Sequence, residues 1–276
     1  GSYMDSRPLV GSEFLFALDR KTGRHLWSYH SGAGLLPNPT LSIHGNSVTF
    51  VESGNAKTLQ EQRGRATPAE LFKDGAHLVS LDLRSGSVRW SRRHDFSAIQ
   101  HSIFLSAAKG RIAVVGSRND GTNKKTARVC YDIHVFDAES GERRWFQSQT
   151  QTTGIGGDHG EQDHHPVIVG NTLYCEPFAW DLSTGKPVKD FAWKNSHRRG
   201  CGTITASAST IFFRDSNASM FDLDSNTYGR VTTTTRPGCW INMIPAGGLL
   251  LVPEASSGCT CNFAIQTSLA FRPAGR

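Results

Sequence analysis

Hydrophobic residues along the chain occur in short segments, where they alternate with polar residues or run together before a turn-forming residue. No stretch approaches the ~20 consecutive apolar residues that cross a membrane as a helix. The segment Leu15–Leu18 leads into Asp19, and Gly23 and Trp27 follow four and eight positions after that aspartate. Short apolar runs bounded by turn residues are typical of β-strands. The pattern therefore predicts a strand, a tight turn and a return strand over 15–27.

This phrase recurs along the chain. Its complete copies share Asp, Gly and Trp at identical spacing and are Asp19-Gly23-Trp27, Asp82-Gly86-Trp90 and Asp137-Gly141-Trp145. Two partial copies follow, one with Asp181 and Gly185 but no tryptophan at that spacing, the other with Asp222 and Asn226. Aspartate accepts hydrogen bonds from turn amides, and Gly or Asn tolerates the left-handed backbone that closes a turn. We therefore expect five related hairpins, and a tryptophan at the end of three of them can bury a large area between sheets.

A second hairpin is predicted between successive phrases, over Pro39–Ser53, Ile103–Ser117, Pro166–Glu176, Thr203–Asp215 and Trp240–Glu254. The aspartates lie 63, 55, 44 and 41 residues apart, and the last two spacings match the ~40–50 residues of a four-stranded propeller blade. The longer spacings contain polar insertions at Gly54–Gly75 and Arg118–Arg128, which we expect to be loops. Two hairpins per period predict an all-β fold, a β-propeller of four-stranded antiparallel blades.

The predicted blades do not complete a ring. About five to six blades are visible, because the chain begins with the last two strands of a blade and ends with three strands, Ile241–Pro245, Leu249–Pro253 and Gln266–Phe271. We expect an incomplete ring or a piece of a larger propeller, whose open edges would pair with another chain or with the missing blades. Residues 1–4 look like a cloning remnant, after which 5–276 form the propeller, and any signal peptide would already be removed.

Composition supports a turn-rich β fold and narrows the partners. Glycine accounts for 28 of 276 residues, and the formal net charge is +6 without a long basic run. Nucleic-acid binders concentrate their cations on one helix or stripe, so nucleic acid is not an expected partner. A mildly basic surface suits an acidic polymer such as a uronate-containing glycan. The six cysteines lack zinc-ligand spacing, and we expect either disulfides in a periplasmic or extracellular protein or free buried thiols.

The Asp-x-x-Thr/Ser-Gly-x-x-x-Trp phrase resembles the repeat of quinoprotein-type β-propellers, also called pyrroloquinoline-quinone-like repeats. The resemblance covers essentially the whole chain, and the run from Pro237 to Cys261 resembles the ends of large exported propeller proteins. It implies a disc of radially packed sheets, a fold that hosts dehydrogenases, assembly scaffolds and glycan-active enzymes. Bound quinone is not expected, because the dehydrogenases have a vicinal Cys-Cys pair, a tryptophan platform and a calcium-binding set. This chain has Cys259-Thr-Cys261 instead.

The resemblance also places candidate ligand-binding residues at one rim of the predicted central channel. In such a blade the innermost strand begins at the channel mouth, which is the usual place for a ligand. The residues delivered there include His101, Arg198, Arg236, Trp240 and Asn242. Disulfides between Cys201 or Cys239 and the Cys259/Cys261 pair would fix that rim, with their connectivity left open, and Cys130 with Cys175 would form a third pair.

The richest segment on this rim runs from Gly156 to Pro166 and combines three histidines with three carboxylates. His159, Asp163 and His164 have a composition suited to a divalent metal. A general base with an orienting carboxylate is a second interpretation, and a polar loop with local hydrogen bonds is a third. The cofactor, if there is one, is not identified by this pattern.

Two functions from different classes follow from these residues. The first is an exported binding or scaffold propeller that recognises a protein or a glycan at its rim. The second is a polysaccharide lyase acting on an acidic glycan. There Arg198 or Arg199 would neutralise a uronate and His164 or His165 would remove the C5 proton. The predicted catalytic residues are therefore His164, His165 and Arg199.

Overall fold

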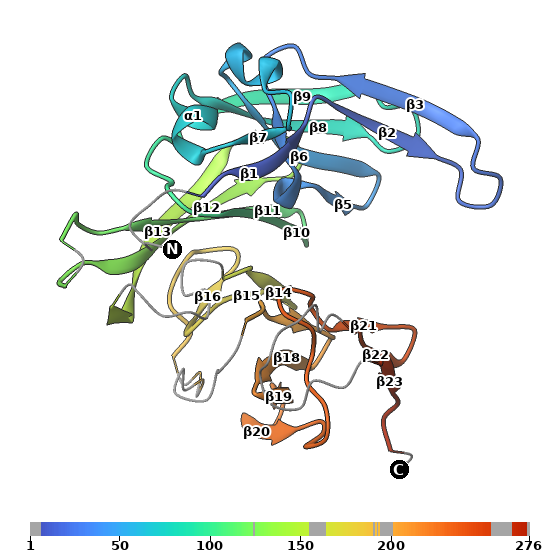
Figure 1. Ribbon diagram of the computed structural model, residues 1–276, viewed down its shortest axis with the longest axis vertical. Coiled ribbons are helices and arrows are strands. Elements are labelled where there is room, and N and C mark those ends of the chain that lie inside the picture. The colour runs from blue at the N-terminus through green and yellow to red at the C-terminus, as the bar shows by residue number, and fades with distance from the viewer. Residues whose placement is uncertain are drawn as a thin grey trace. The chain divides into compact units, whose positions relative to one another are not determined.

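The computed structural model describes residues 7–123, 125–154, 164–189, 191, 193, 201–254 and 267–274. The chain divides into two compact units, Gly1–Gly156 and Gly157–Arg276. Figure 1 shows that β-strands dominate both units. In the described part of the chain, no helix is long and apolar enough to span a membrane.

The first unit contains two complete four-stranded antiparallel sheets. One has the order β5 (Ser42–His44), β6 (Ser47–Ser53), β8 (Ala76–Asp82), β9 (Val88–His94). The next has the order β10 (Ile103–Ala108), β11 (Arg111–Asn119), β12 (Arg128–Asp137), β13 (Arg143–Gly154). The unit begins with the hairpin of β2 (Phe14–Leu18) and β3 (His25–His30), and with a small sheet of order β4 (Leu36–Pro37), β1 (Leu9–Ser12), β7 (Arg65–Ala66).

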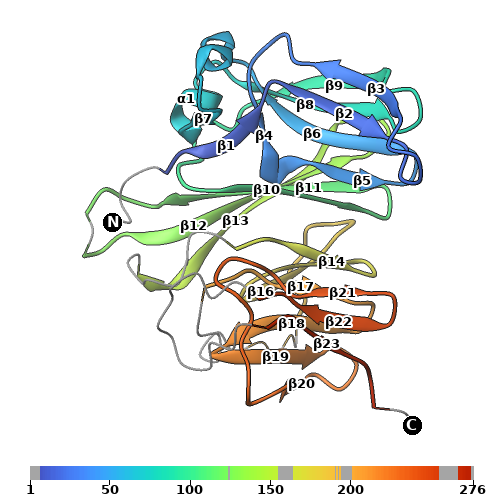
Figure 2. The same ribbon diagram turned by 45° about the vertical axis from the view of Figure 1, so that its right-hand side comes forward.

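The second unit continues the same sequential pattern (Figure 2). Its first sheet has the order β14 (Val167–Val169), β15 (Thr172–Cys175), β16 (Phe178–Asp181). The second has the order β17 (Thr205–Ala206), β18 (Thr210–Asp215), β19 (Asn217–Asp222), β20 (Thr227–Arg230). The third has the order β21 (Ile244–Ala246), β22 (Leu249–Val252), β23 (Leu269–Phe271). Sequential antiparallel sheets of up to four strands are propeller blades. The all-β prediction and the β-propeller prediction are confirmed, as are the two-stranded start and the three-stranded end.

The five aspartate turns share one set of hydrogen bonds. In the first, Oδ1 of Asp19 accepts from the Thr22 amide at 2.8 Å and from the Thr22 hydroxyl at 2.7 Å, and the Gly23 amide donates to the Asp19 carbonyl at 2.8 Å. These donors stabilise the charged carboxylate, so the pKa of Asp19 lies below its usual value. The turn aspartates all show this lowering, with hydrogen bonds as the main cause: Asp19, Asp82, Asp137, Asp181 and Asp222. Asn226, which replaces the turn glycine in the fifth copy, has φ +57° as expected.

Each tryptophan of the first two copies packs onto the turn of the following copy. Trp27 Nε1 donates to the Leu83 carbonyl at 3.0 Å, and its ring covers Gly86 so closely that a Cβ placed there would lie 2.6 Å from Cδ2. Trp90 repeats the contact one copy later, with Nε1 on the Ala138 carbonyl at 3.2 Å and its ring over Gly141. Neighbouring sheets are thus joined by a large apolar ring and a directed hydrogen bond.

The Gly54–Gly75 insertion is not the polar loop that we predicted. It contains a 3-10 helix (Ala56–Gln60), strand β7 and the short helix α1 (Pro68–Phe72). Thr67 and Glu70 form a reciprocal capping box at the start of α1, and Leu71 and Phe72 are buried in the core of the first unit. The polar composition of the insertion gave no indication that Leu71 and Phe72 belong to the core. The described part of the Arg118–Arg128 insertion does connect β11 to β12 as a loop.

Candidate functional site

Several predicted site residues lie outside the residues that the structure describes, namely His159, Asp163, Arg198 and Arg199. The predicted metal set is therefore represented only by His164. In the described part of the chain, no group of three or more His, Cys, Asp or Glu side chains could hold a metal ion. The metal site and the catalytic role of Arg199 stay predictions.

His164 and His165 lie just before β14, next to the start of the predicted hairpin Pro166–Glu176. His164 is buried. Nδ1 of His165 is 2.7 Å from the Pro166 carbonyl oxygen, and burial lowers the pKa of its ring. Since a carbonyl only accepts, Nδ1 carries the proton and Nε2 of the neutral ring is left as an acceptor. This is the protonation state that a general base needs, but its partner Arg199 is not described, so the lyase stays a prediction.

Arg236 and Trp240 are brought together with Cys201 and Cys239. Nη1 of Arg236 lies 3.6 Å from Cys239 Sγ and 3.4 Å from the Pro237 carbonyl oxygen. The Trp240 amide donates to the Cys201 carbonyl at 3.5 Å. The Trp240 side chain is half exposed, and its backbone has φ +60°, a conformation that is strained for a bulky residue.

Asn242, another predicted ligand-binding residue, is used within the fold. Its Oδ1 accepts from the Thr203 amide at 3.1 Å, and its Nδ2 donates to the Thr203 hydroxyl at 2.6 Å. These bonds join the segments before β17 and β21. His101 is buried at the start of β10 in the first unit, where its amide donates to the Ser117 carbonyl at 3.1 Å. Ligand binding by both residues stays a prediction.

Sequence reasoning missed Arg214, a buried arginine at the end of β18. Its Nη1 is 3.5 Å from the Cys201 carbonyl oxygen and 3.5 Å from Cys239 Sγ, so two guanidinium groups approach the same sulfur. A signal was present in the repeats. Arg214 lies six positions after Ala208, the turn residue of its predicted hairpin. The residues at the same distance from the turns at Gly45, Lys109 and Gly170 are Val51, Val115 and Glu176. Charged residues at this position in two blades, Glu176 and Arg214, where the first two blades have valine, are the feature that should have been selected.

The predicted disulfide between Cys130 and Cys175 is not found: both are buried thiols outside any disulfide. Cys130 Sγ instead lies 3.0 Å from the Ser148 hydroxyl on the neighbouring strand, and burial raises the pKa of the Cys175 thiol. Cys239 is also a free thiol, so the predicted disulfide that joins it to Cys259 or Cys261 is not found. Cys259 and Cys261 themselves lie outside the described residues.

The first unit has a different kind of surface, along β2. One face of the β2–β3 hairpin packs Leu15, Ala17 and Trp27 against the core. The opposite face exposes large apolar side chains, which are Phe14, Phe16, Leu18 and Leu26. The Phe14 and Phe16 ring centroids are 6.0 Å apart. In a propeller both faces of a blade are normally covered by neighbouring sheets, whereas this face carries exposed apolar side chains.

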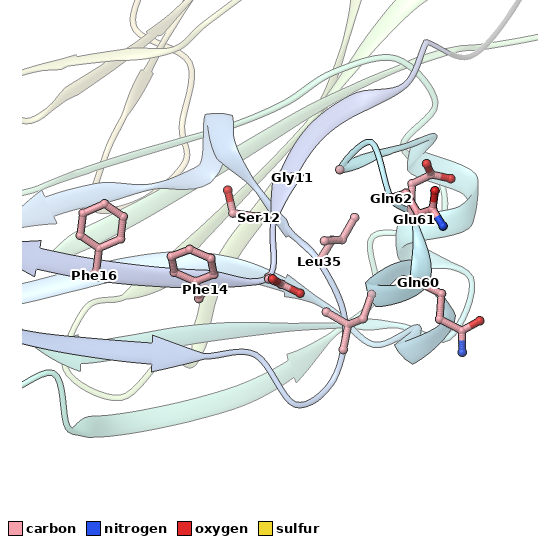
Figure 3. A pocket seen from close by; sticks show the side chains of 11 residues that line it. Gly11, Ser12, Phe14, Phe16, Leu35, Gln60, Glu61 and Gln62 are labelled. Atoms are coloured by element: carbon pink, nitrogen blue, oxygen red, sulfur yellow. The ribbon is translucent and has the colours of Figure 1, made fainter.

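A pocket of about 450 Å³ lies at the start of β2, where β1 passes into it. Figure 3 shows Phe14 and Phe16 along the strand, and Gln60, Glu61 and Gln62 on the insertion beside it. Glu13 also lines the pocket. The surface along β2 therefore combines exposed aromatic rings with an acidic, amide-rich end, a composition that can contact both apolar and cationic groups.

The solved structures similar to this chain include three of different activity. The WD40 domain of Neurospora crassa Pan2 is 12 % identical, with a TM-score of 0.47, and covers 98 % of this chain and 81 % of its own. The europium-containing methanol dehydrogenase is 12 % identical, with a TM-score of 0.45. Its match covers 90 % of this chain and 61 % of the dehydrogenase. The rhamnogalacturonan lyase YesW is 11 % identical, with a TM-score of 0.45. Its match covers 84 % of this chain and 46 % of the lyase. The chain thus spans 61 % of the dehydrogenase and 46 % of the lyase.

A search of curated proteins finds no match to the chain. One family model does match, the one described as "Outer membrane protein assembly factor BamB", over residues 11–191. The match spans more than half of the chain, including the three complete copies of the aspartate phrase and the fourth. The repeat phrase, the blade-like sheets and this match agree: the chain belongs to the outer membrane protein assembly factor BamB family of pyrroloquinoline-quinone-like repeat β-propellers.

Proposed function

We propose that this chain is a binding and scaffold propeller in an exported complex, and that it holds an extended segment of a partner protein along β2. The name of the family supports a role in protein assembly. The observation that carries the proposal is the free edge of β2. In each other copy of the aspartate phrase, the strand that enters the turn has an inner neighbour: β8 has β6, β12 has β11, β16 has β15 and β19 has β18. In the described part of the chain β2 pairs with β3 alone.

The backbone groups on this edge can be assigned from the register. The Ser31 amide donates to the Glu13 carbonyl, and Leu15 lies opposite Tyr29. Hydrogen-bonded pairs alternate along an antiparallel ladder, so Leu15 and Ala17 direct their N–H and C=O groups towards β3. Phe14 and Phe16 direct theirs to the other edge. An unpaired edge of this kind is a template for another strand.

The neighbouring strands define where an added strand would lie. β1 continues into β2, and β7 pairs with β1 through Leu9–Ala66 and Val10–Arg65. β4 pairs with the other edge of β1. A segment added to β2 would lie beside Phe14 and Phe16, which line one pocket together with Glu13, Glu61 and Gly64. Its chemistry follows from that path: an extended peptide with apolar side chains beside Phe14 and Phe16, and a lysine or arginine near Glu13 and Glu61.

Amide hydrogen exchange tests the edge in the full chain. At micromolar concentration the Phe14 and Phe16 amides should exchange at least tenfold faster than the Leu15 and Ala17 amides. The synthetic peptide Lys-Val-Thr-Val-Thr-Val-Lys should slow exchange at Phe14 and Phe16 without changing the pattern at β12. Protection of Phe16 in the chain alone would contradict the proposal, because the edge would already be paired.

A matched pair of variants separates the backbone from the side chain. Phe16→Pro removes the outward N–H, and proline is tolerated on an edge strand. Phe16→Val keeps the N–H and a residue suited to a strand. We expect the first to abolish peptide binding and the second to weaken it less than threefold. Equal binding by both variants would show that the peptide does not add to β2.

A further inference from the structure

We infer that the second unit contains a buried binding site for one carboxylate group, formed by the guanidinium of Arg236 with the guanidinium of Arg214 beside it. This site is independent of the β2 edge and does not rest on the proposed scaffold function. Arg236 was a predicted ligand-binding residue, but neither its ligand chemistry nor the second arginine follows from the sequence.

The two side chains are almost fully removed from solvent, with exposed fractions of 5 % for Arg236 and 6 % for Arg214. Each uses Nη1 for the contacts to Cys239 described above. Three further nitrogens are buried without a hydrogen-bond acceptor among the described residues: Nε and Nη2 of Arg236 and Nε of Arg214. Neither arginine has an ion pair within the part of the chain that the structure describes. A buried guanidinium without an acceptor or a counter-charge is strongly unfavourable, which favours an anion at this position.

The unpaired atoms define the shape of that anion. Nε and Nη2 lie on the same edge of a guanidinium and point their N–H bonds in parallel, so together they match the two oxygens of a carboxylate. The first unit shows this fork occupied. Nε of Arg118 donates to Asp132 Oδ2 at 2.7 Å, and Nη2 donates to Oδ1 at 3.1 Å. Arg236 presents the same edge, and no carboxylate among the described residues lies on it.

Size and charge favour a carboxylate over a phosphate. The free donors are one planar fork and one additional N–H, which suit a flat group with a single negative charge. A phosphate would bring a second charge and further oxygens into a buried place that offers them only the Nε of Arg214. The half-exposed Trp240 follows Cys239 directly in the chain. The ligand class is thus a carboxylate, either as a small free acid or as the acid group of a sugar.

The experiment uses the full chain and direct observation of arginine side chains. The 15Nε and Hε signals of Arg236 are followed by NMR while sodium acetate, sodium D-galacturonate, sodium phosphate or sodium chloride is added at equal ionic strength. The neutral methyl ester of galacturonic acid is the matched control for the sugar. We expect saturable downfield shifts of Arg236 Hε with acetate and galacturonate, no shift with the ester or chloride, and at least tenfold weaker binding of phosphate.

The affinities for acetate and for galacturonate distinguish the two sources of the carboxylate. Galacturonate binding at least tenfold tighter than acetate would identify a sugar acid, and equal affinities would identify a small free acid. Arg236→Lys keeps the charge but removes the fork, and should weaken acetate binding at least tenfold. Arg118→Lys removes the occupied fork and should leave the affinity unchanged. The absence of any saturable Arg236 shift in the wild-type chain would overturn the proposal even if the lysine variants failed to fold. A shift of equal size with chloride would overturn it too.

Discussion

The first copy of the aspartate phrase and the two that follow have the same turn in different surroundings. Asp19, Asp82 and Asp137 each accept from the two amides that precede their glycine. The rings of Trp27 and Trp90 cover the glycines of the second and third copies. In the described part of the chain, a Cβ on Gly23 of the first copy would have no neighbour within 4 Å.

The strands that lead into these turns also differ in how many neighbouring strands they have. β8 and β12 lie between two strands each, whereas β2 has one described partner. The comparison separates two properties that the repeat phrase encodes. The turn depends on bonds within five consecutive residues, so it forms in every copy. The tryptophan contact joins two copies, because the tryptophan of one copy covers the turn glycine of the next.

The largest expected effect comes from removing a covering tryptophan. Trp90→Ala deletes the ring over Gly141 and the hydrogen bond to the Ala138 carbonyl. A buried Trp→Ala change costs about 3–5 kcal/mol of stability. Phe16→Ala is the matched control from the first copy, because Phe16 is 55 % exposed and should cost about 0.5 kcal/mol or less. Urea unfolding followed by far-UV circular dichroism measures both, and equal losses would show that the ring over the turn does not stabilise the first unit.

Adding a methyl group to the turn glycines sharpens the same comparison. In Gly141→Ala the new Cβ would lie 2.7 Å from Trp90 Cε3, at a φ of +71°. Overpacking of about 1–3 kcal/mol then adds to the ~1 kcal/mol that the left-handed backbone costs a non-glycine residue. Gly23→Ala has a φ of +70° but no such contact, so only the backbone cost of ~1 kcal/mol remains. Chemical denaturation of the two variants should differ by that packing cost; a Gly23→Ala variant as unstable as Gly141→Ala would mean that Gly23 is covered as well.

The same separation explains what could be predicted from the sequence. The aspartate turns and the hairpins were predictable because each depends on residues that are neighbours along the chain. The Gly54–Gly75 insertion was wrongly interpreted even though Thr67 and Glu70 have capping-box spacing. Leu71 and Phe72 stabilise that segment through burial in the core, and burial depends on distant residues that a local pattern does not reveal.

The candidate sites follow the same rule. Arg236 could be selected because it precedes a predicted inner strand, and that placement is local. Arg214 could not be linked to it, since the two meet only through Cys239, which is 25 residues from Arg214. The free edge of β2 was anticipated in outline from the incomplete blade. Its exposed aromatic face required knowing which side of the hairpin the core covers.

Acid pH tests the turns themselves, and the effect is the smallest because these carboxylates are exposed. The Asp19 carboxylate has a lowered pKa mainly through the Thr22 hydroxyl, and Asp137 mainly through Arg144, whose Nη2 lies 2.8 Å away. Because the folded pKa is below the unfolded value of about 3.9, their contribution is present at neutral pH and is lost as pH falls through the lowered folded value. Asp19→Asn and Asp137→Asn should therefore destabilise the chain at pH 7. This destabilisation should disappear once the pH falls below the lowered pKa of the aspartate.

Salt distinguishes the two copies in this last comparison. Arg144 and Arg111 both pair with Asp137 at the surface, and ions screen such pairs strongly at 1 M salt, where the Debye length is about 3 Å. The Asp19 turn relies on hydrogen bonds from neutral groups, which salt affects little. Urea midpoints at pH 7 should therefore show that 1 M sodium chloride reduces the cost of Asp137→Asn more than the cost of Asp19→Asn. Equal salt dependence would mean that the arginines add nothing and that the same local turn bonds account for both copies.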